Sequence, residues 1–390
     1  MARMRTAAAT GSMVLLQSTT TRSFAVRGAT AVIWSTQNRA VSLRPTWLQH
    51  QHQQQRLHQQ PLGSKLTLSS ASASPAGPGP EIPATDEDLT EVAQHLRGLL
   101  DAAGGSAVAL TGAGMSTDSG IPDYRGPQGS YSRGHKPMTH DEFLSSEDNR
   151  KRYWARSTFG WDSFSKAKPN AAHGALAELE AAGKLSGVIT QNVDGLQQKA
   201  GSRKVIDMHG RNDQVECMSC RIRSNRNAYQ ENLSRLNAPW IAEYSPELKS
   251  GKKGTGGTAD SDEEAREGDP AVHLRADGDA DVEPGAYLGG FVVPACEQCG
   301  GILKPTVVFF GDNIPRQRVE ETYRIVDESS LLIAAGSSLQ VYSAFRLVKR
   351  AADAGKRLVV INLGDTRAER SGLDLLKVEA GVSSILPQLL

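Results

Sequence analysis

The chain has 390 residues, of which 22% are charged and 38% hydrophobic, and its formal net charge at pH 7 is +1. This length is enough for two or three domains, and the absence of a basic stripe in the central and C-terminal parts speaks against a nucleic-acid partner. No apolar run reaches the roughly 18–20 residues of a membrane-spanning helix, so no membrane partner is expected, and the oligomeric state stays open.

The first 80 residues are basic and contain no Asp or Glu. Arginines are scattered among Ser, Thr, Ala and Gln, and residues 49–60 and 69–80 are of low complexity. The apolar stretch Ser12–Leu16 is too short for a secretory core. The composition predicts that residues 1–80 are an organelle transit peptide, with the mitochondrial matrix as destination and the chloroplast as alternative. A disordered, untargeted leader is the other interpretation.

Residues 81–390 are predicted to form the folded part, which begins with a helix. Thr85 can cap it with Asp88 three residues on, and Gly104 follows its last turn. Short, continuously apolar runs come next, typical of strands buried on both faces: Ala107–Leu110, Gly187–Thr190, Val205–Met208, Thr306–Phe310, Leu331–Ala335 and Leu358–Ile361. Helix candidates such as Ala171–Ala182 and Ser343–Ala354 lie between several of them. The alternation predicts an α/β fold with a doubly wound, mostly parallel, Rossmann-like sheet.

The four cysteines of the chain form two Cys-x-x-Cys pairs, Cys217 with Cys220 and Cys296 with Cys299. Four thiolates close a tetrahedral zinc shell and leave no position for water, so one structural Zn²⁺ is predicted. Two disulfides or a redox-active pair are the alternatives. They are disfavoured because no secretory signal is found and because a redox pair needs only two cysteines on a thioredoxin-like unit.

The zinc ligands define a small module, residues 212–303, inserted into the sheet domain. Within it, residues 249–285 are rich in Gly, Asp and Glu and poor in large apolar side chains. Such a segment cannot bury enough surface to order itself, so a disordered acidic loop is predicted.

A glycine pair follows the first strand, in Gly112-Ala113-Gly114-Met115-Ser116. Such a pair lets backbone amides approach a pyrophosphate at the carboxyl end of a strand. Thr117 stands where the dinucleotide fingerprint has its third glycine, and no acidic residue ends a second strand about twenty positions later. A hydride-transferring dehydrogenase is therefore disfavoured. The loop that follows, with Pro122 and Gly126, suits a mobile cover over a cofactor.

Six motifs in a fixed order carry a resemblance to a known family. They are GAGMSTDSGIPDYR, TQNVDGL, a His-Gly after a strand, the two cysteine pairs, VVFFGD and GSSLQV. Together they resemble the sirtuins, the NAD-consuming protein-lysine deacylases, over about residues 86–390. RYWARS, PNAAH, QNVDGLQQKAGS and GSSLQVYS are similar to the class II mitochondrial group typified by sirtuin four.

The resemblance implies an activity and its partners. The chain would be an NAD-dependent protein-lysine deacylase that acts on acylated-lysine proteins and releases nicotinamide and 2′-O-acyl-ADP-ribose. NAD would be consumed as a co-substrate. Two alternatives stay open: protein mono-ADP-ribosyl transfer, and a catalytically weak NAD-binding interaction module that docks partners through the acidic loop.

The resemblance also implies roles for particular residues. His209 would take a proton from the ribose hydroxyls, and Asn192 would take part in catalysis. Asp194, with Ile121 and Asp123, would line the nicotinamide pocket. The full set of residues assigned to NAD is Gly112, Ala113, Gly114, Ser116, Ile121, Asp123, Tyr124, Arg125, Tyr131, Gln191, Asn192, Val193, Asp194, Gly336, Ser337, Ser338, Asn362, Leu363, Gly364 and Ala380.

Without the resemblance, His209 would be interpreted as a structural histidine and residues 192–195 as a turn that caps a helix. Val307–Asp312 resembles the strand edge to which sirtuins add their substrate peptide. Tyr124 stands where many sirtuins have Phe. The segment from Tyr131 to Arg133 leaves an acidic acyl substrate, such as a glutaryl-like group, open, although its spacing does not match the Tyr and Arg of acid-preferring members.

Overall fold

The structure is a computed structural model, and it describes residues 86–127, 129–249, 274–280 and 288–390. All of these belong to one of the two units of the chain, residues 62–390. The predicted transit peptide and most of the predicted acidic loop lie outside the described residues. Among the described residues, no helix is long and apolar enough to cross a membrane.

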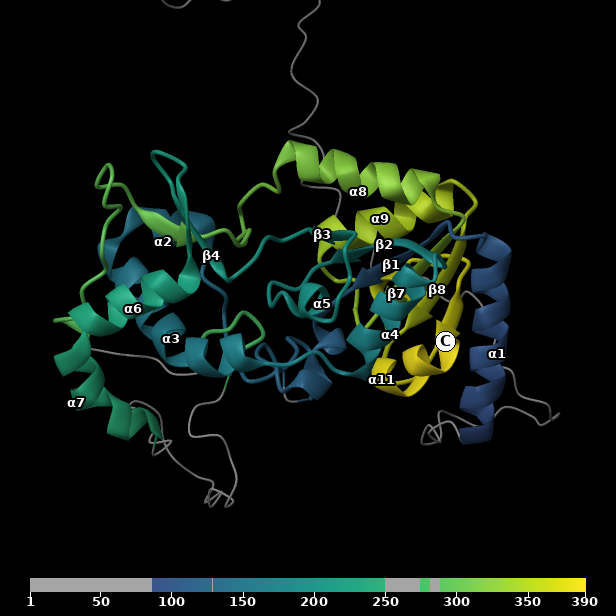
Figure 1. Cartoon of the computed structure of the whole chain (residues 1–390), viewed down its shortest axis with the longest axis horizontal. Helices are drawn as coiled ribbons and strands as arrows, with labels where there is room; N and C mark the ends of the chain where they lie inside the picture. Colours follow the sequence, from purple (N-terminus) through teal and green to yellow (C-terminus); the bar gives the residue numbers. More distant parts are fainter. Residues whose placement is uncertain (1–85, 128, 250–273, 281–287) are drawn as a thin grey trace, which may run out of the picture. The chain divides into compact units, whose positions relative to one another are not determined.

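Six parallel strands form the main sheet in the order β3-β2-β1-β7-β8-β9 (Figure 1). They are β1 Ala107–Thr111, β2 Leu185–Thr190, β3 Val205–Asp207, β7 Leu331–Ala335, β8 Arg357–Ile361 and β9 Leu376–Val378. The order runs outward from β1 in one direction and from β7 in the other. The predicted doubly wound α/β fold is therefore confirmed, and the topological switch point lies between β1 and β7.

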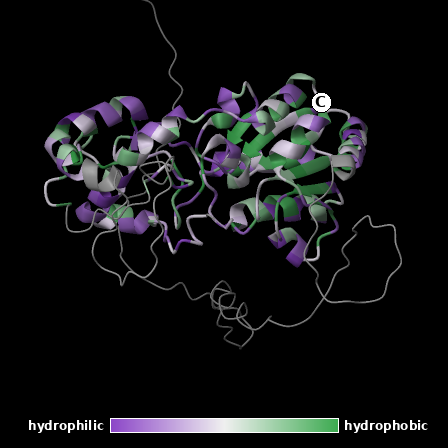
Figure 2. Cartoon of the chain, turned by 90° about the horizontal axis from the view of Figure 1, so that it is seen from below, coloured by the Kyte–Doolittle hydropathy of each residue, from purple (hydrophilic) through white to green (hydrophobic). Residues whose placement is uncertain are grey.

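Helices pack on both faces of this sheet. The core on one face joins residues of α1 Asp86–Ala103, α4 Ala171–Ala181 and α11 Val382–Ile385 to Ala107 and Ala109 of β1. On the other face, α8 Arg316–Glu328 and α9 Tyr342–Asp353 pack on Val108 and Leu110. Successive residues of a strand point to opposite faces, so a strand between two helical layers must be apolar throughout. Figure 2 shows the strands coloured as hydrophobic between helices with hydrophilic outer faces.

One predicted strand is wrong. The sequence predicts Thr306–Phe310 as a strand of the parallel sheet, but the strand in this region is β6 Leu303–Pro305, and within 306–310 only Phe310 forms an isolated bridge, to Thr139. β6 pairs antiparallel with β4 Gln214–Cys217, which also pairs with β5 Arg223–Asn225. The apolar run at 306–310 reflects burial around a site rather than a ladder, since Val307 and Phe309 pack in two side-chain clusters.

The small region around this antiparallel sheet draws on two segments of the chain. Besides α6 Arg226–Leu236 and α7 Ala238–Lys249, it includes α2 His140–Ser145 and α3 Glu147–Lys166. Phe143 and Trp154 of these earlier helices share a core with Val215 and Tyr229. The sequence predicts only residues 212–303 here. The remaining short helices are α5 Leu196–Lys199, α10 Arg367–Arg370, and the 3-10 turns Ala113–Met115, Thr117–Ser119 and Leu386–Leu389.

Residues 274–280, all of which lie within the loop predicted to be disordered, form a short buried hairpin. Leu274 and Ala280 bridge each other, and the Ala280 amide donates to the Arg156 carbonyl at 3.1 Å. Asp279 is 1% exposed and its carboxylate pairs with the Arg156 guanidinium at 3.5 Å. Gly278 turns the chain at φ +84°, where glycine is favoured. Composition does not reveal this segment because its ordering depends on partners in α3.

Candidate functional site

A cavity of about 910 Å³ opens at the carboxyl ends of β1, β2, β7 and β8. Open α/β sheets bind ligands at this edge, at the point where the strand order reverses. Most of the residues that the resemblance assigns to NAD line this cavity. They are Ala113, Gly114, Ser116, Ile121, Asp123, Tyr124, Arg125, Tyr131, Gln191, Asn192, Val193, Asp194, Gly336, Ser337, Ser338, Asn362, Leu363 and Gly364.

Glycines allow the ends of β1 and β7 to approach each other at the floor of the cavity. The Gly114 amide donates to the Gly336 carbonyl at 2.9 Å. A Cβ on Gly112 would lie 2.7 Å from that carbonyl oxygen, and a Cβ on Gly336 would lie 2.5 Å from the Met115 nitrogen. Gly336 also has φ +60°, in the left-handed region. Side chains at Gly112 or Gly336 would push the two strand ends apart. They would also fill the space in which the backbone can approach a ligand.

The segment after β2 carries an ordered polar network. The Asn192 amide donates to Ser116 Oγ at 3.0 Å, and that hydroxyl donates to the Asp194 carboxylate at 2.8 Å. The Gln191 amide donates to Ser337 Oγ at 2.8 Å. Ser116 and Ser337 follow β1 and β7, so the polar groups of three neighbouring strand ends are linked. The side chains are held in orientation before any ligand binds.

His209, after β3, lies in the same cavity. Its Nδ1 is 3.1 Å from the Gln191 carbonyl oxygen, and its Nε2 is 2.8 Å from Ser343 Oγ at the start of α9. Burial, together with the positive charges of Arg318 and Arg346, lowers the pKa of His209 to about 4, although the hydrogen bond to the Gln191 carbonyl opposes the shift. A neutral imidazole at pH 7 is able to accept a proton.

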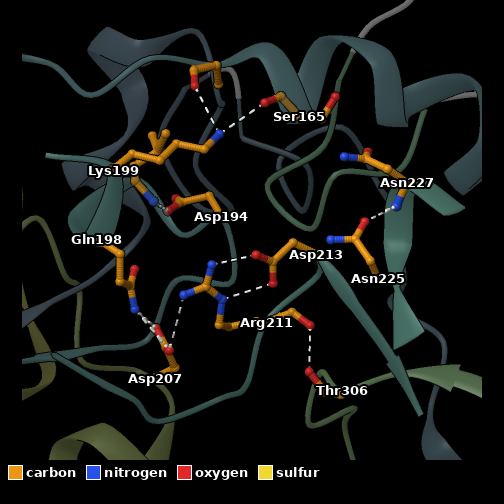
Figure 3. Close-up of polar contacts among 12 residues, drawn as sticks. Ser165, Asp194, Gln198, Lys199, Asp207, Arg211, Asp213, Asn225, Asn227 and Thr306 are labelled. Atoms are coloured by element: carbon orange, nitrogen blue, oxygen red, sulfur yellow. Dashed lines mark hydrogen bonds and ion pairs between the residues drawn. The ribbon is translucent and has the colours of Figure 1, made fainter. Parts of the chain in front are cut away.

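The segment that carries His209 is fixed on both sides (Figure 3). Gln198 donates to the Asp207 carboxylate at 2.8 Å, and Arg211 Nε donates to the Asp213 carboxylate at 2.9 Å. The Thr306 hydroxyl donates to the Arg211 carbonyl at 2.9 Å. Gln198 and Thr306 thus bind the residues two positions before and two positions after His209.

The loop after the glycine pair forms one wall. The rings of Tyr124 and Tyr131 lie with their centroids 5.2 Å apart, and the Arg125 guanidinium is 5.0 Å from the Tyr131 ring centre. Burial, with the nearby charge of Asp277, raises the pKa of Tyr124 well above its ordinary value, so its hydroxyl stays protonated. Arg133 is not among the residues found to line the cavity in the described part of the chain.

The buried hairpin contributes a wall that the sequence did not predict, through Ala276 and Asp277. The Asn212 amide donates to the Asp277 carbonyl at 2.7 Å, which holds the turn next to the segment after His209. No signal in the sequence marks these residues, because they lie in a stretch of Gly, Asp and Glu. Val307–Asp312, Ser343 and Arg370 also contribute residues to the lining of the cavity.

Two residues assigned to NAD are not among the described residues that line the cavity. Gly112 lies beneath it, where its lack of a side chain lets the Gly336 carbonyl approach. Ala380 is 6% exposed and belongs to the core formed with α1 and α4. Its side chain packs into this core. Asn362, which follows β8, lines the cavity instead.

The four cysteines come together in the small region. Their Sγ atoms lie within 4.8 Å of one another, with 3.5 Å between Cys217 and Cys299 and 3.7 Å between Cys220 and Cys296. A disulfide needs about 2.05 Å. Four sulfurs around zinc at about 2.3 Å would be separated by roughly 3.8 Å. The geometry fits one structural zinc ion and does not fit two disulfides.

Comparison with known proteins agrees with this geometry. The model of the Sir2 family matches residues 112–343. NAD-dependent protein deacylase SIR4 of Batrachochytrium dendrobatidis is 42% identical over 293 residues, 73% of this chain and 89% of that protein. NAD-dependent protein deacylase SRT2 of Arabidopsis thaliana is 42% identical over 281 residues, 72% of this chain and 71% of that protein.

A solved structure extends the similarity to the fold. A Sir2 protein solved with a deacetylated p53 peptide and 3′-O-acetyl ADP-ribose is 29% identical, with a TM-score of 0.54 over 76% of this chain and 96% of that one. Sequence, fold and site agree, and the chain belongs to the Sir2 family, the sirtuins.

Proposed function

We propose that this sirtuin uses His209 as the base of an NAD-dependent protein-lysine deacylation. The activity follows from the family, whose relatives include enzymes named NAD-dependent protein deacylases. The observation that supports the base assignment is the half-buried His209 imidazole, neutral at pH 7, in the cavity that Gly114 and the Asn192 amide also line. NAD is the co-substrate, and its nicotinamide is released.

Each wall of the cavity has a proposed role toward NAD. The Gly114 amide is taken by the Gly336 carbonyl and the Gly336 amide by the Ile361 carbonyl, so neighbouring backbone groups of these two turns bind the phosphates, and Asn362 binds the adenosine end. Asp194, held by Ser116, faces the nicotinamide carboxamide, and Asn192 orients the ribose. The acyl-lysine carbonyl oxygen attacks C1′ of the ribose as nicotinamide leaves. His209 then takes a proton from a ribose hydroxyl, so that this oxygen attacks the acyl carbon and 2′-O-acyl-ADP-ribose forms.

The acylated peptide is proposed to bind along residues 307–312. The Val308 amide donates to the His209 carbonyl at 2.8 Å, so this segment lies directly beside the base. Phe310, which lines the cavity, is 44% exposed and is therefore accessible to a bound peptide. An extended peptide paired with this segment would direct an acyl-lysine into the cavity, and backbone pairing implies loose sequence preference. A relative was solved with a deacetylated p53 peptide and an acetyl ADP-ribose.

Subgroup, destination and acyl group are proposed from the sequence. The motifs RYWARS and GSSLQVYS favour the class II group typified by sirtuin four. The basic leader favours a mitochondrial matrix destination. Protein mono-ADP-ribosyl transfer is the second candidate, because the same cavity would activate NAD toward another acceptor. The acyl group is open, with a glutaryl-like group among the candidates.

The products of the reaction test the function. The purified chain is incubated with NAD and peptides that carry acetyl, lipoyl, glutaryl-like or long-chain acyl lysines, and the products are weighed by mass spectrometry. We expect acyl-ADP-ribose and deacylated peptide for at least one acyl class. In His209→Ala both should fall to background while NAD binding is kept, and His95→Ala, an exposed histidine of α1, serves as control. ADP-ribose attached to protein, without deacylated peptide, would favour the transferase instead.

A further inference from the structure

The Nε2 atom of His209 is already engaged by a side chain that no assignment above uses. Ser343 Oγ lies 2.8 Å from it and comes from the first turn of α9, 134 positions along the chain. Both residues line the cavity. The contact therefore lies within the catalytic space and not behind it.

The two contacts of the ring determine which nitrogen is the base. A carbonyl oxygen has no proton to give, so at the Gln191 carbonyl, 3.1 Å away, Nδ1 must carry the hydrogen. A neutral imidazole has only one N–H, which leaves a lone pair on Nε2. The Ser343 hydroxyl then donates to Nε2. The basic lone pair points at Ser343, and a substrate hydroxyl can reach it only by displacing that side chain or by passing its proton through it.

We infer that Ser343 is a catalytic relay: the ribose proton reaches His209 Nε2 through the Ser343 hydroxyl. This inference rests on the proposed role of His209 as base. The ribose O–H bond breaks as its proton bonds to Ser343 Oγ, and the original Ser343 proton bonds to Nε2. The ribose oxygen keeps the electron pair and becomes the nucleophile. The positive charge stays on the imidazolium, whose Nδ1–H remains bonded to the Gln191 carbonyl.

Three features of the site support relay over displacement. The His209 ring is held by the Gln191 carbonyl at Nδ1 and by Ser343 Oγ at Nε2, and the residues two positions before and after it are themselves hydrogen-bonded. No other hydrogen-bond partner of Ser343 Oγ is found among the described residues, so the oxygen is free to accept a proton. Ser343 also lies in the first turn of the 12-residue helix α9, whose positive end stabilises negative charge developing on this oxygen.

Relay and displacement predict opposite effects of removing the hydroxyl. If Ser343 passes the proton, Ser343→Ala leaves a gap between the ribose and Nε2, and deacylation slows. If Ser343 only blocks Nε2, the same variant exposes the base, and deacylation stays equal or becomes faster. Ser343→Thr keeps a hydroxyl on the same carbon and should restore most of the rate under the relay.

The test separates the proton transfer from the earlier loss of nicotinamide. Exchange of labelled nicotinamide into NAD, in the presence of acylated peptide, reports the step before the base acts. We expect exchange to persist in Ser343→Ala while kcat for deacylated peptide falls about tenfold or more, as for loss of a proton-transfer group. Ser234→Ala, on α6 in the small region, is the control for a serine hydroxyl outside the cavity.

Each outcome has a distinct meaning. Unchanged or faster deacylation in Ser343→Ala overturns the relay but leaves the function intact, provided that His209→Ala is still inactive. Loss of exchange in Ser343→Ala also overturns it, because Ser343 would then act on NAD binding. If His209→Ala keeps full deacylation, the proposed base itself fails. If the wild-type chain shows neither exchange nor deacylation, the proposed function fails.

A second measurement needs no variant and covers the case in which Ser343→Ala fails to fold. The single-turnover rate of the wild-type chain is followed in mixtures of H₂O and D₂O after nicotinamide release. A relay moves two protons in one step, so the rate should depend on the deuterium fraction along a curve. A straight line would indicate one moving proton and would contradict the relay.

Discussion

The acid-base behaviour of His209 is decided by its neighbours. An ordinary histidine has a pKa near 6.5, whereas burial and the charges of Arg318 on α8 and Arg346 on α9 lower the pKa of His209 to about 4. The imidazole therefore stays unprotonated well below neutral pH, and the same shift makes it a weaker proton acceptor than an ordinary histidine. A typical histidine base would lose half of its active form near pH 6.5.

The pH dependence of kcat/KM should reflect this shift. We expect no loss of kcat/KM attributable to His209 between pH 7 and about 5, and an acid limb near pH 4, because kcat/KM reports the groups of the free enzyme.

The free energy of unfolding should also fall as the pH is lowered. The unfolded chain binds a proton on this histidine first, so the stability that its neutral form provides is present above about pH 6.5 and is lost as the pH falls toward 4. An acid limb near 6.5, with a matching NMR titration of the ring, would contradict the assignment.

Gly336 is a second residue whose role depends on its surroundings, here the close approach of the ends of β1 and β7. A Cβ at this position would lie 2.5 Å from a backbone nitrogen and φ is +60°, whereas Gly355 has φ +67° and nothing within 4 Å. Gly355→Ala should lower the free energy of unfolding by about 1–2 kcal/mol, the cost of a left-handed residue. Gly336→Ala should cost at least about 1 kcal/mol more and weaken NAD binding, because β1 and β7 must separate. Equal effects in chemical denaturation would show that the close approach is unimportant.

At the scale of elements, the hairpin at 274–280 links a helix of the small region to the cavity. Asp279 pairs with Arg156 of α3, while Ala276 and Asp277 line the cavity. Burial, together with the charge of Asp277, raises the pKa of Asp279 to about 7, although Arg156 and Arg275 oppose the shift. The wall of the cavity therefore depends on a segment anchored by the buried contact between Asp279 and Arg156, in which the Asp279 carboxyl gains a proton near pH 7.

Gly160 of α3 has no side chain, and this allows the hairpin to pack against the helix. A Cβ there would lie 2.2 Å from the Gly278 carbonyl oxygen, while a Cβ on Gly174 of α4 would have nothing within 4 Å. Gly174→Ala should stabilise the chain by about 0.5–1 kcal/mol through helix propensity. Gly160→Ala should instead destabilise it by about 1–3 kcal/mol and change KM for NAD or peptide, because the hairpin is displaced. If Gly160→Ala proves as stable as Gly174→Ala with unchanged KM, the hairpin does not form this wall.

At the scale of the whole molecule, the cysteine cluster holds the small antiparallel sheet together. Cys217 ends β4, and the second pair precedes β6, so the metal joins segments that are 82 positions apart at Cys217 and Cys299. Small zinc modules gain roughly 10–16 kcal/mol of apparent binding energy, far more than the closure of a long loop costs. The insertion between the pairs is therefore compatible with a stable fold.

Removal of zinc should unfold the small region rather than remove chemistry alone. Cys217→Ser is expected to lose bound zinc and to lower the melting temperature, as should prolonged chelation of the wild-type chain. Ser219→Ala, between the first two cysteines, keeps all four thiolates and serves as control. Metal content by mass spectrometry and thermal melting check both. A Cys217→Ser chain that stays fully folded and loses only activity would show that the metal is not structural.

The sequence by itself determined the parts that local pattern controls. The continuously apolar runs at 107–110, 187–190 and 331–335 predicted central strands, because burial on both faces permits no polar alternation. The cysteine spacing predicted the metal cluster, and the ordered motifs predicted the family. Each strand, each Cys-x-x-Cys pair and each motif consists of residues close to one another along the chain.

The tertiary structure alone decided what depends on distant residues. It removed residues 306–309 from the sheet, joined α2 and α3 to the small region, and buried a hairpin that composition assigns to disorder. It also brought Ser343 to Nε2 of His209, across 134 positions. A buried polar group must find a hydrogen-bond partner, and the packing of distant elements determines which partner lies next to it. No local sequence pattern specifies that partner.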